Sequence, residues 1–243
     1  MASNPHAAGP APVPYKIPSV HPEGLKFTGI AAAITLVAFL AGWSVVGWLL
    51  VGLTIWVAAF FRDPVRVTPA GEGLIVSPAD GLVCQIMRVE APRQLLGEGG
   101  LEPQGLTRVS VFMSVFDVHI NRAAIGGTVR RVAYVPGAFV NADLDKASEE
   151  NERNYILIEG MDGVKVGFTQ IAGLVARRIL CFVKEGDLVA AGQRIGLIRF
   201  GSRVDIFVPD GFNVQVVKGQ RAVAGETIVA RRDVVAAEPG PAQ

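Results

Sequence analysis

A Gly-Ser pair near the C-terminus, Gly201-Ser202, could carry out a reaction on the chain itself. A serine hydroxyl can attack the carbonyl carbon of the residue before it, and glycine both leaves that carbon unshielded and tolerates the strained backbone that the attack needs. The peptide bond then becomes an ester. Elimination of this ester leaves a dehydroalanine, whose hydrolysis gives a pyruvoyl group. The same pair is also typical of an ordinary turn, so the reaction needs support from the rest of the sequence.

His119 is the candidate base, because the other two histidines precede a long apolar segment. It follows the apolar run 111–118, at whose end a side chain can reach a cleft, and imidazole is the side chain suited to proton transfer near neutral pH. Two carboxylates are candidates for orienting its ring. Asp80 stands in an Asp-Gly step, which is otherwise typical of a hairpin turn. Asp117 shares a strand face with His119 if the strand continues that far.

Three further residues are candidates for binding an anionic substrate. Arg122 and Arg153 carry guanidinium groups, which bind phosphate or carboxylate through paired hydrogen bonds. Asn151 opens the polar block 151–154, which also contains Arg153. The alternative is that these residues form a solvated loop or have structural roles.

The candidate residues lie in short blocks that follow one another in a fixed order. The blocks are Ser-Pro-Ala-Asp-Gly at 77–81, Phe-Asp-Val-His-Ile-Asn-Arg at 116–122, Asn-Glu-Arg-Asn at 151–154, Gln-Ile-Ala-Gly at 170–173 and Phe-Gly-Ser at 200–202. Over residues 61–230 they resemble the phosphatidylserine decarboxylase proenzymes, in particular the short membrane-bound (archaeal-type) subfamily. Arg203 favours the short form, since longer bacterial relatives have Thr there. Ala123-Ala124 depart from the family, which often has a proline nearby.

The resemblance implies an enzyme that decarboxylates phosphatidylserine to phosphatidylethanolamine with a pyruvoyl group made from Ser202. It implies that Ser202 is the nucleophile, that His119 is the general base, and that Asp80 orients the imidazole. Cleavage between Gly201 and Ser202 would give a large chain, 1–201, and a small chain, 202–243. We expect the two chains to remain associated, because separation would expose a buried core.

Two other kinds of function fit part of the sequence. A pyruvoyl-dependent decarboxylase of a soluble amino acid would use the same Gly-Ser chemistry but would not need an apolar anchor. Lys146, within Asp-Lys-Ala, resembles the modified lysine of lipoyl- or biotinyl-type carrier domains. Carriers, however, place that lysine in the turn between the two halves of a repeat, and in this chain the corresponding position holds Gly201-Ser202.

The segment 27–61 contains 35 residues without a charge. A single helix of that length would extend about 50 Å at about 1.5 Å per residue, whereas the hydrocarbon core of a membrane is about 30 Å thick. We therefore predict a transmembrane or re-entrant hairpin with helices at 27–41 and 45–61. A single tilted helix is the alternative. The flanking basic residues would then share one side of the membrane, which the positive-inside tendency makes cytoplasmic: Lys16, Lys26, Arg62 and Arg66.

Beyond residue 62 the sequence is typical of a mainly β fold, with short apolar runs separated by Gly, Pro and Asp. We expect strands at 73–76, 81–89, 108–115, 127–134, 155–159, 164–171 and 179–183. A helical turn is expected after Pro92, and a short helix or ordered loop at 143–151. The segment 186–195 matches 219–228 at an offset of 33. This repeat predicts a β-sandwich whose C-terminal half resembles a lipoyl- or biotinyl-type hammerhead.

Four parts of the chain follow from these patterns: a disordered head (1–26), a membrane anchor (27–61), a self-cleaving catalytic β domain (62–235) and a disordered tail (236–243). The formal net charge of +1, without a dense basic cluster, gives no reason to expect a nucleic-acid partner. The expected partners are a phospholipid substrate and the cell membrane. Cys84 and Cys181 are expected to be buried thiols, and their spacing to other ligands predicts no metal site.

Overall fold

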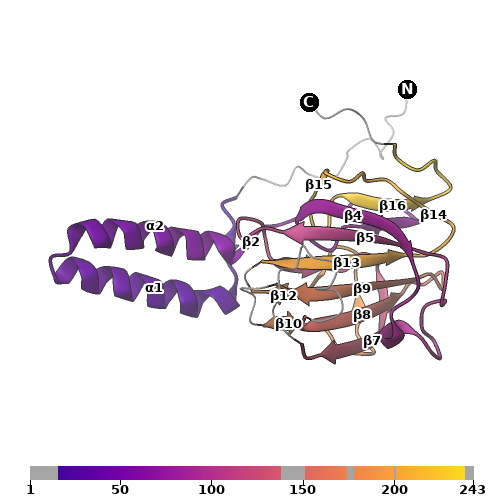
Figure 1. Cartoon of the computed structure of the whole chain (residues 1–243), viewed down its shortest axis with the longest axis horizontal. Coiled ribbons are helices and arrows are strands. Elements are labelled where there is room, and N and C mark those ends of the chain that lie inside the picture. Colours follow the sequence, from indigo (N-terminus) through magenta and orange to yellow (C-terminus); the bar gives the residue numbers. More distant parts are fainter. Residues whose placement is uncertain (1–15, 138–150, 174–177, 200, 239–243) are drawn as a thin grey trace, which may run out of the picture.

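The computed structural model describes residues 16–137, 151–173, 178–199 and 201–238, which form a helical hairpin and a β domain (Figure 1). The carrier-like Lys146 and residues 143–150 of the helix or loop expected at 143–151 lie outside the described residues.

The hairpin consists of α1 (Pro22–Leu40) and α2 (Ser44–Phe60). Gly42 makes the turn between them with a φ of 79°, a conformation that favours glycine. The sequence prediction of two helices is thus confirmed over the single tilted helix. At the base, strand β1 (Ser19–Val20) pairs with β2 (Arg62–Asp63), so the hairpin begins and ends beside the β domain. Of the described helices, α1 is long and apolar enough to cross a membrane, judged by length and composition only.

The folded chain begins earlier than the predicted boundary at residue 26. Strand β1 and the first turn of α1 occupy part of the predicted head. Gly24 lies so close to Phe61 that an added Cβ would come within 2.2 Å of the Phe61 side chain. The base of the hairpin is therefore a packed junction. At the other end of the chain, Ala237 donates a backbone hydrogen bond to Val214, so the predicted tail also begins within the folded part.

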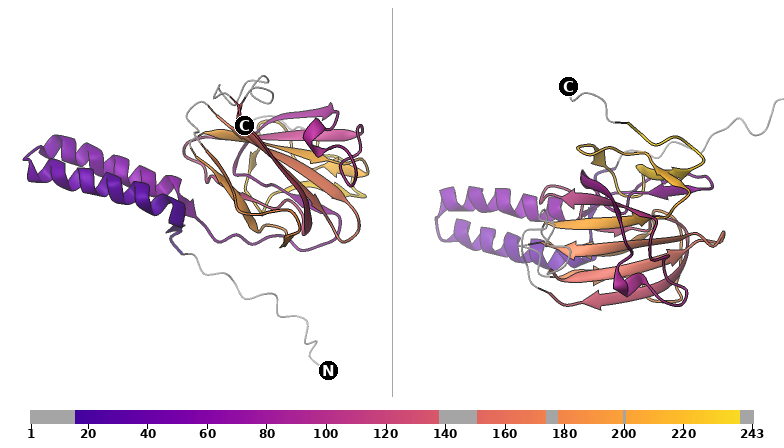
Figure 2. Two further views of the ribbon diagram at one scale, coloured as in Figure 1. Left: turned by 90° about the horizontal axis from the view of Figure 1, so that it is seen from below. Right: turned by 45° about the vertical axis from the view of Figure 1, so that its right-hand side comes forward.

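The β domain contains one long sheet and two short ones. The elements are β3 (Leu74–Val76), β4 (Gly81–Val89), η1 (Arg93–Leu95), β5 (Leu106–Met113), β6 (Ile120–Arg122), β7 (Gly127–Val135), β8 (Arg153–Glu159), β9 (Lys165–Ala172), β10 (Ile179–Cys181), β11 (Leu188–Val189), β12 (Arg194–Ile198), β13 (Ser202–Val208), β14 (Phe212–Val214), β15 (Arg221–Ala222) and β16 (Ile228–Arg232). The eight-stranded antiparallel sheet has the order β11-β7-β8-β9-β13-β5-β4-β15 and curls into a half-barrel (Figure 2). The three-stranded sheets are β10-β12-β6 and β14-β16-β3.

The mainly β prediction is confirmed, and each predicted strand has a counterpart in the structure. Side chains from the long sheet and both short sheets form one buried cluster, for example Phe168 and Ile206 with Ile195 and Val229. The short sheets therefore pack against one face of the long sheet. The prediction of two buried thiols is wrong: Cys181, at the end of β10, is exposed, and Cys84 is only half-buried.

The two copies of the sequence repeat share one local conformation. Gly186 and Gly219 have φ values of 90° and 92°, and Gly192 and Gly225 have values of 75° and 76°. However, β11 of the first copy pairs with β7 at one edge of the long sheet, and β15 of the second pairs with β4 at the other edge. The comparison with a hammerhead stays a prediction.

Candidate functional site

Ser202 is the first residue of β13, near the middle of the long sheet. Its register partners are Met113 on β5 and Ala172 on β9. The side chain is buried, and its hydroxyl donates a hydrogen bond to Met113 Sδ over 3.4 Å. The preceding Gly201 has a φ of 65°, in the left-handed region that favours glycine. The Gly-Ser bond thus lies where the backbone leaves a left-handed conformation and enters the sheet.

Hydrogen bonds hold the backbone on both sides of the Gly201 α-carbon. The Gly201 N–H donates to His119 Nε2 over 3.2 Å. The Gly173 N–H donates to the Gly201 carbonyl oxygen over 3.1 Å. A backbone donor aimed at the carbonyl that the serine would attack is the arrangement of an oxyanion hole. The sequence pointed to Gly173 only as the end of the block 170–173.

His119 is buried and held in one tautomer by its neighbours. Its Nδ1 lies 2.9 Å from the Asp117 carbonyl oxygen, to which it can only donate. This leaves Nε2 unprotonated, a tautomer assigned from the hydrogen-bond network. Burial lowers the pKa of His119 to about 4. The ring is therefore neutral near pH 7, and Nε2 can accept a proton.

The helical hairpin forms one wall of this site. The Phe60 ring lies 4.2 Å from the His119 ring, measured between centroids. Phe60 and Phe61 are buried in a cluster with Val118 and Ile120. A chain that began at Arg62 would lose this packing, although every predicted catalytic residue lies beyond that point. The uncharged block offered no signal that singled out Phe60.

Asp117 orients His119 through its backbone and not through its carboxylate. The carboxylate accepts hydrogen bonds from the Ser114 N–H over 2.9 Å and the Ser114 hydroxyl over 2.8 Å, and it also contacts Arg221. These bonds fix the turn that presents the Asp117 carbonyl to the ring.

Asp80, the predicted orienting residue, forms no hydrogen bond with His119 in the described part of the chain. Its carboxylate accepts the Ala224 N–H over 2.7 Å and pairs with Arg66 over 2.6 Å. Burial raises its pKa, although Ala224 and Arg66 act in the opposite direction. Asp117 influences the pKa values of both Asp80 and His119. Asp80 thus shares the charged neighbours Asp117 and Arg62 with His119 and forms no hydrogen bond with it among the described residues.

The structure gives Arg122 and Asn151 bonds to backbone carbonyls. Arg122 donates to Gly192 over 2.8 Å and is almost fully buried. Asn151 donates to the Ala172 carbonyl over 2.6 Å. Since Ala172 precedes Gly173, Asn151 helps to position the donor to the Gly201 carbonyl.

Alternation along β13 separates two environments. Ser202 faces Met113 in the core, whereas Arg203 faces the other side and forms a buried ion pair with Asp205 over 2.7 Å. Arg153 and Asp205 line a pocket on that outer side. The structure therefore does not bring Arg153 to Ser202.

A chain of buried amides leads toward Ser202 from β8, β9 and β6. Asn154 Nδ2 donates to Gln170 Oε1, and Gln170 Nε2 donates to Asn121 Oδ1, each over 2.8 Å. Asn121 Nδ2 lies 3.7 Å from Met113 Sδ, the sulfur that also accepts the Ser202 hydroxyl. The chain fixes the orientation of each amide and so orients the polar groups beneath the Gly-Ser bond.

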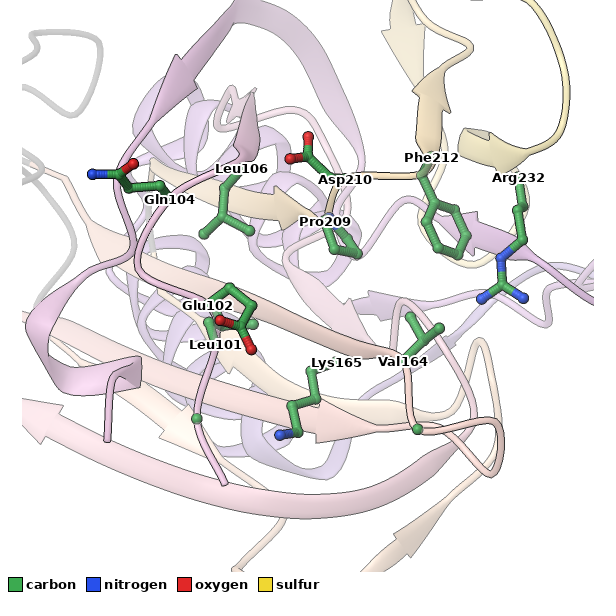
Figure 3. A pocket seen from close by; sticks show the side chains of 12 residues that line it. Leu101, Glu102, Gln104, Leu106, Val164, Lys165, Pro209, Asp210, Phe212 and Arg232 are labelled. Atoms are coloured by element: carbon green, nitrogen blue, oxygen red, sulfur yellow. The ribbon is translucent and has the colours of Figure 1, made fainter. Parts of the chain in front are cut away.

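A pocket of about 330 Å³ lies at the other end of β13 (Figure 3). Lys165, Asp210 and Arg232 are among its lining residues, and none of the predicted site residues is. It is therefore separate from the candidate site.

The site contains the groups that intramolecular acyl transfer to a serine requires: a nucleophile, a neutral base and a donor to the carbonyl oxygen. The arrangement is that of a class of sites in which a serine hydroxyl attacks a carbonyl carbon. Residues 53–230 match the sequence model of the family described as phosphatidylserine decarboxylase, and the chain belongs to that family.

Relatives with known names agree with this assignment. The chain is 60% identical over 218 residues to a phosphatidylserine decarboxylase proenzyme of Novosphingobium aromaticivorans, a match that covers 88% of this chain and 86% of that protein. Proteins of the same name from Erythrobacter litoralis and Zymomonas mobilis are each 58% identical, over 88% of this chain and 88% and 87% of their own lengths. These relatives are bacterial and do not test the archaeal-type subfamily.

Proposed function

We propose that this chain decarboxylates phosphatidylserine to phosphatidylethanolamine, after cutting itself between Gly201 and Ser202 to form a pyruvoyl group from Ser202. One observation carries the proposal. The buried serine follows a left-handed glycine whose carbonyl oxygen accepts the Gly173 N–H and whose N–H is bound by His119.

In the first step, the Ser202 hydroxyl turns from Met113 Sδ toward His119 and attacks the Gly201 carbonyl carbon. His119 Nε2 exchanges its hydrogen bond from the Gly201 N–H for the hydroxyl proton, because the ring is neutral and its other nitrogen donates to the Asp117 carbonyl. The Gly173 N–H stabilises the charge that develops on the Gly201 oxygen. His119 Nε2 then gives the proton to the Ser202 nitrogen, the bond between that nitrogen and the Gly201 carbonyl carbon breaks, and an ester with a free amine replaces the amide.

The second step breaks the covalent link between the two chains. A base removes the α-hydrogen of residue 202, the bond between its β-carbon and the ester oxygen breaks, and Gly201 leaves as a carboxylate. Water then replaces the nitrogen of the resulting dehydroalanine, and ammonia leaves. The residues around Ser202 fit the product, because the new N-terminus begins at the buried start of β13, beside His119.

In turnover, the pyruvoyl group supplies an electrophilic carbonyl for the substrate amine and withdraws electrons from the carbon that loses carbon dioxide. His119 returns a proton to that carbon. Phe60 and the surrounding core exclude water, which strengthens the electrostatic interactions within the site.

Asp80 completes the proposed catalytic set with His119 and Ser202. Its negative charge lies in the electrostatic neighbourhood that Asp117 and Arg62 share with His119. We assign it the stabilisation of the charged imidazole and not direct orientation of the ring.

The two products of cleavage are expected to stay together. In the small chain, β13 pairs with β5 and β9 of the large chain on both sides. Strand β15 pairs with β4, and β16 pairs with β3. The small chain is thus interleaved with the large one, and its release would expose the shared core.

The hairpin supports attachment to a membrane, with the β domain on the cytoplasmic side. Large apolar side chains are exposed along it, including Leu40, Trp43, Trp48 and Leu49. Both ends of the hairpin meet at the β domain, so the flanking basic residues lie on one side. The anchor and Arg203 also favour the short membrane-bound subfamily.

The test is the conversion of phosphatidylserine by purified protein in detergent micelles, with lipid products identified by mass spectrometry. We expect phosphatidylethanolamine and carbon dioxide from the wild type and neither from Ser202→Ala. Cleavage without decarboxylation of any serine phospholipid would contradict the proposal.

A further inference from the structure

A charged cluster lies at the base of the hairpin, next to the segment that carries the Gly-Ser bond. Arg199 follows β12, two residues before Gly201. Its Nη2 donates to the Glu23 carboxylate over 2.9 Å, and its guanidinium lies 5.1 Å from the Phe27 ring centroid. Glu23 also pairs with Lys26 over 3.7 Å. The cluster thus contains two cations and one anion.

Arg199 has unused hydrogen-bonding capacity. Among the described residues, Glu23 is the one hydrogen-bond partner of the guanidinium, and the Arg199 Nε is buried without a partner. The side chain is 14% exposed. Since a guanidinium offers five N–H donors in a fixed fork, it can hold a second anion beside the first.

An apolar groove leads to this cluster along the hairpin. It lies between α1 and α2, has a volume of about 190 Å³, and is lined by Phe27, Ile30, Ala31, Ile34, Leu50, Leu53, Thr54 and Val57. Phe27 belongs both to the groove and to the Arg199 contact. The groove therefore ends beneath a cation that lies three residues from Ser202.

We propose that Arg199 and the hairpin groove form the lipid-binding site, in which Arg199 holds the phosphate of a glycerophospholipid and the groove holds an acyl chain. This inference rests on the proposed function. The order of apolar groove, cation and Ser202 matches the order of acyl chain, phosphate and amine in the lipid. Lys26 adds a second positive charge near the phosphate, and Glu23 stays paired with Arg199 while the phosphate binds the remaining donors of the guanidinium.

The phosphate contact is tested with Arg199→Gln and Arg199→Lys, assayed on phosphatidylserine in mixed micelles and on glycerophosphoserine, which has no acyl chain. Loss of a charge-assisted pair is expected to raise KM about tenfold or more for Arg199→Gln on both compounds, with kcat within about twofold. Arg199→Lys should recover part of the loss. Arg88→Gln is the matched control, since Arg88 pairs with Asp210 on the exposed surface, and its KM should not change.

The acyl contact is tested with Leu53→Trp, which fills the groove. We expect a higher KM for long-chain phosphatidylserine and an unchanged KM for glycerophosphoserine. Ile55→Trp is the control, because Ile55 is exposed on the same helix but does not line the groove.

The results separate this inference from the proposed function. A wild type that is neither cut nor active would overturn the proposed function. A wild type that is cut and active, with KM for Arg199→Gln within about twofold of normal, would overturn the role of Arg199 alone. An Arg199→Gln chain that stays uncut would also contradict the inference, because it would assign Arg199 to maturation. Equal effects of Leu53→Trp and Ile55→Trp would overturn the acyl groove.

Discussion

The two ends of β13 differ in burial, and the candidate site lies at the buried end. At the Ser202 end, the serine and His119 are fully buried, and burial lowers the pKa of His119 to about 4. At the other end, Asp210 pairs with Arg88, and the two side chains are 66% and 65% exposed. Such exposed pairs are screened by water and contribute little energy. The pocket beside Asp210 is also lined by Lys165 and Arg232, yet none of the predicted site residues lines it.

The largest expected effect is that of Ser202→Ala, which should abolish cleavage and activity because no hydroxyl remains to attack Gly201. Denaturing mass spectrometry of the purified variant would find one intact chain. Asp210→Asn is the matched control at the other end of β13 and should be cut like the wild type. If both variants were cut, or neither was, the proposed difference between the two ends of β13 would be wrong.

His119→Ala should slow cleavage about 10²- to 10⁴-fold, the usual contribution of a general base. For the wild type, cleavage should be independent of pH from about 8 to about 5 and should fall as His119 is protonated near pH 4. The histidine pKa is lower in the folded chain than in the unfolded one, so stability is present above about pH 6.5 and decreases below it. Circular dichroism at each pH would separate unfolding from a change in rate. A rate that halves near pH 6.5 in folded protein would contradict a buried, neutral base.

Shortening the hairpin should distinguish its packing against the site from its role as a membrane anchor. Replacement of residues 30–54 by a short linker keeps Phe60 against His119, so cleavage should continue. Activity on phosphatidylserine in bilayers should fall about 10²-fold or more, because the enzyme and its substrate lose their shared surface. Activity on a water-soluble, short-chain analogue should fall much less.

A chain that begins at Arg62 is the informative comparison for this variant. It also lacks Phe60 and Phe61, and burial of large aromatic side chains of this kind contributes about 3–5 kcal/mol. We expect it to cut itself slowly. Normal cleavage would show that the hairpin packing against His119 has no part in maturation.

Asp80→Asn should slow cleavage about tenfold, the effect of about one pKa unit on the proton acceptor. Asp117→Asn should have a smaller effect, because the Asp117 carbonyl that binds His119 is retained. Arg66→Gln breaks the same ion pair as Asp80→Asn from the other side. If Arg66→Gln slowed cleavage as much as Asp80→Asn does, the role of Asp80 would be structural. If Asp117→Asn cleaved itself more slowly than Asp80→Asn, our assignment of the carboxylate that assists His119 would be wrong.

Much of the fold could be predicted because strands and helices produce local patterns of apolar residues in the sequence. The strand expected at 81–89 is β4 with the same bounds, and the turn glycine at 42 was visible between two apolar runs. The pairing of Gly201 with His119 spans 82 residues, so it could be anticipated only from the family resemblance. The Asp117 carbonyl and the Gly173 N–H could not be found this way, since backbone groups have no sequence signature of their own. Phe60 was hidden because neighbouring positions of an apolar block look alike.

The most direct test of self-cleavage at Ser202 is the intact mass of the purified wild-type protein under denaturing conditions. We predict two chains, residues 1–201 and residues 202–243, with the shorter chain carrying a pyruvoyl group at its N-terminus and therefore resistant to Edman sequencing. A single uncut chain in protein that is fully active on phosphatidylserine would contradict the account.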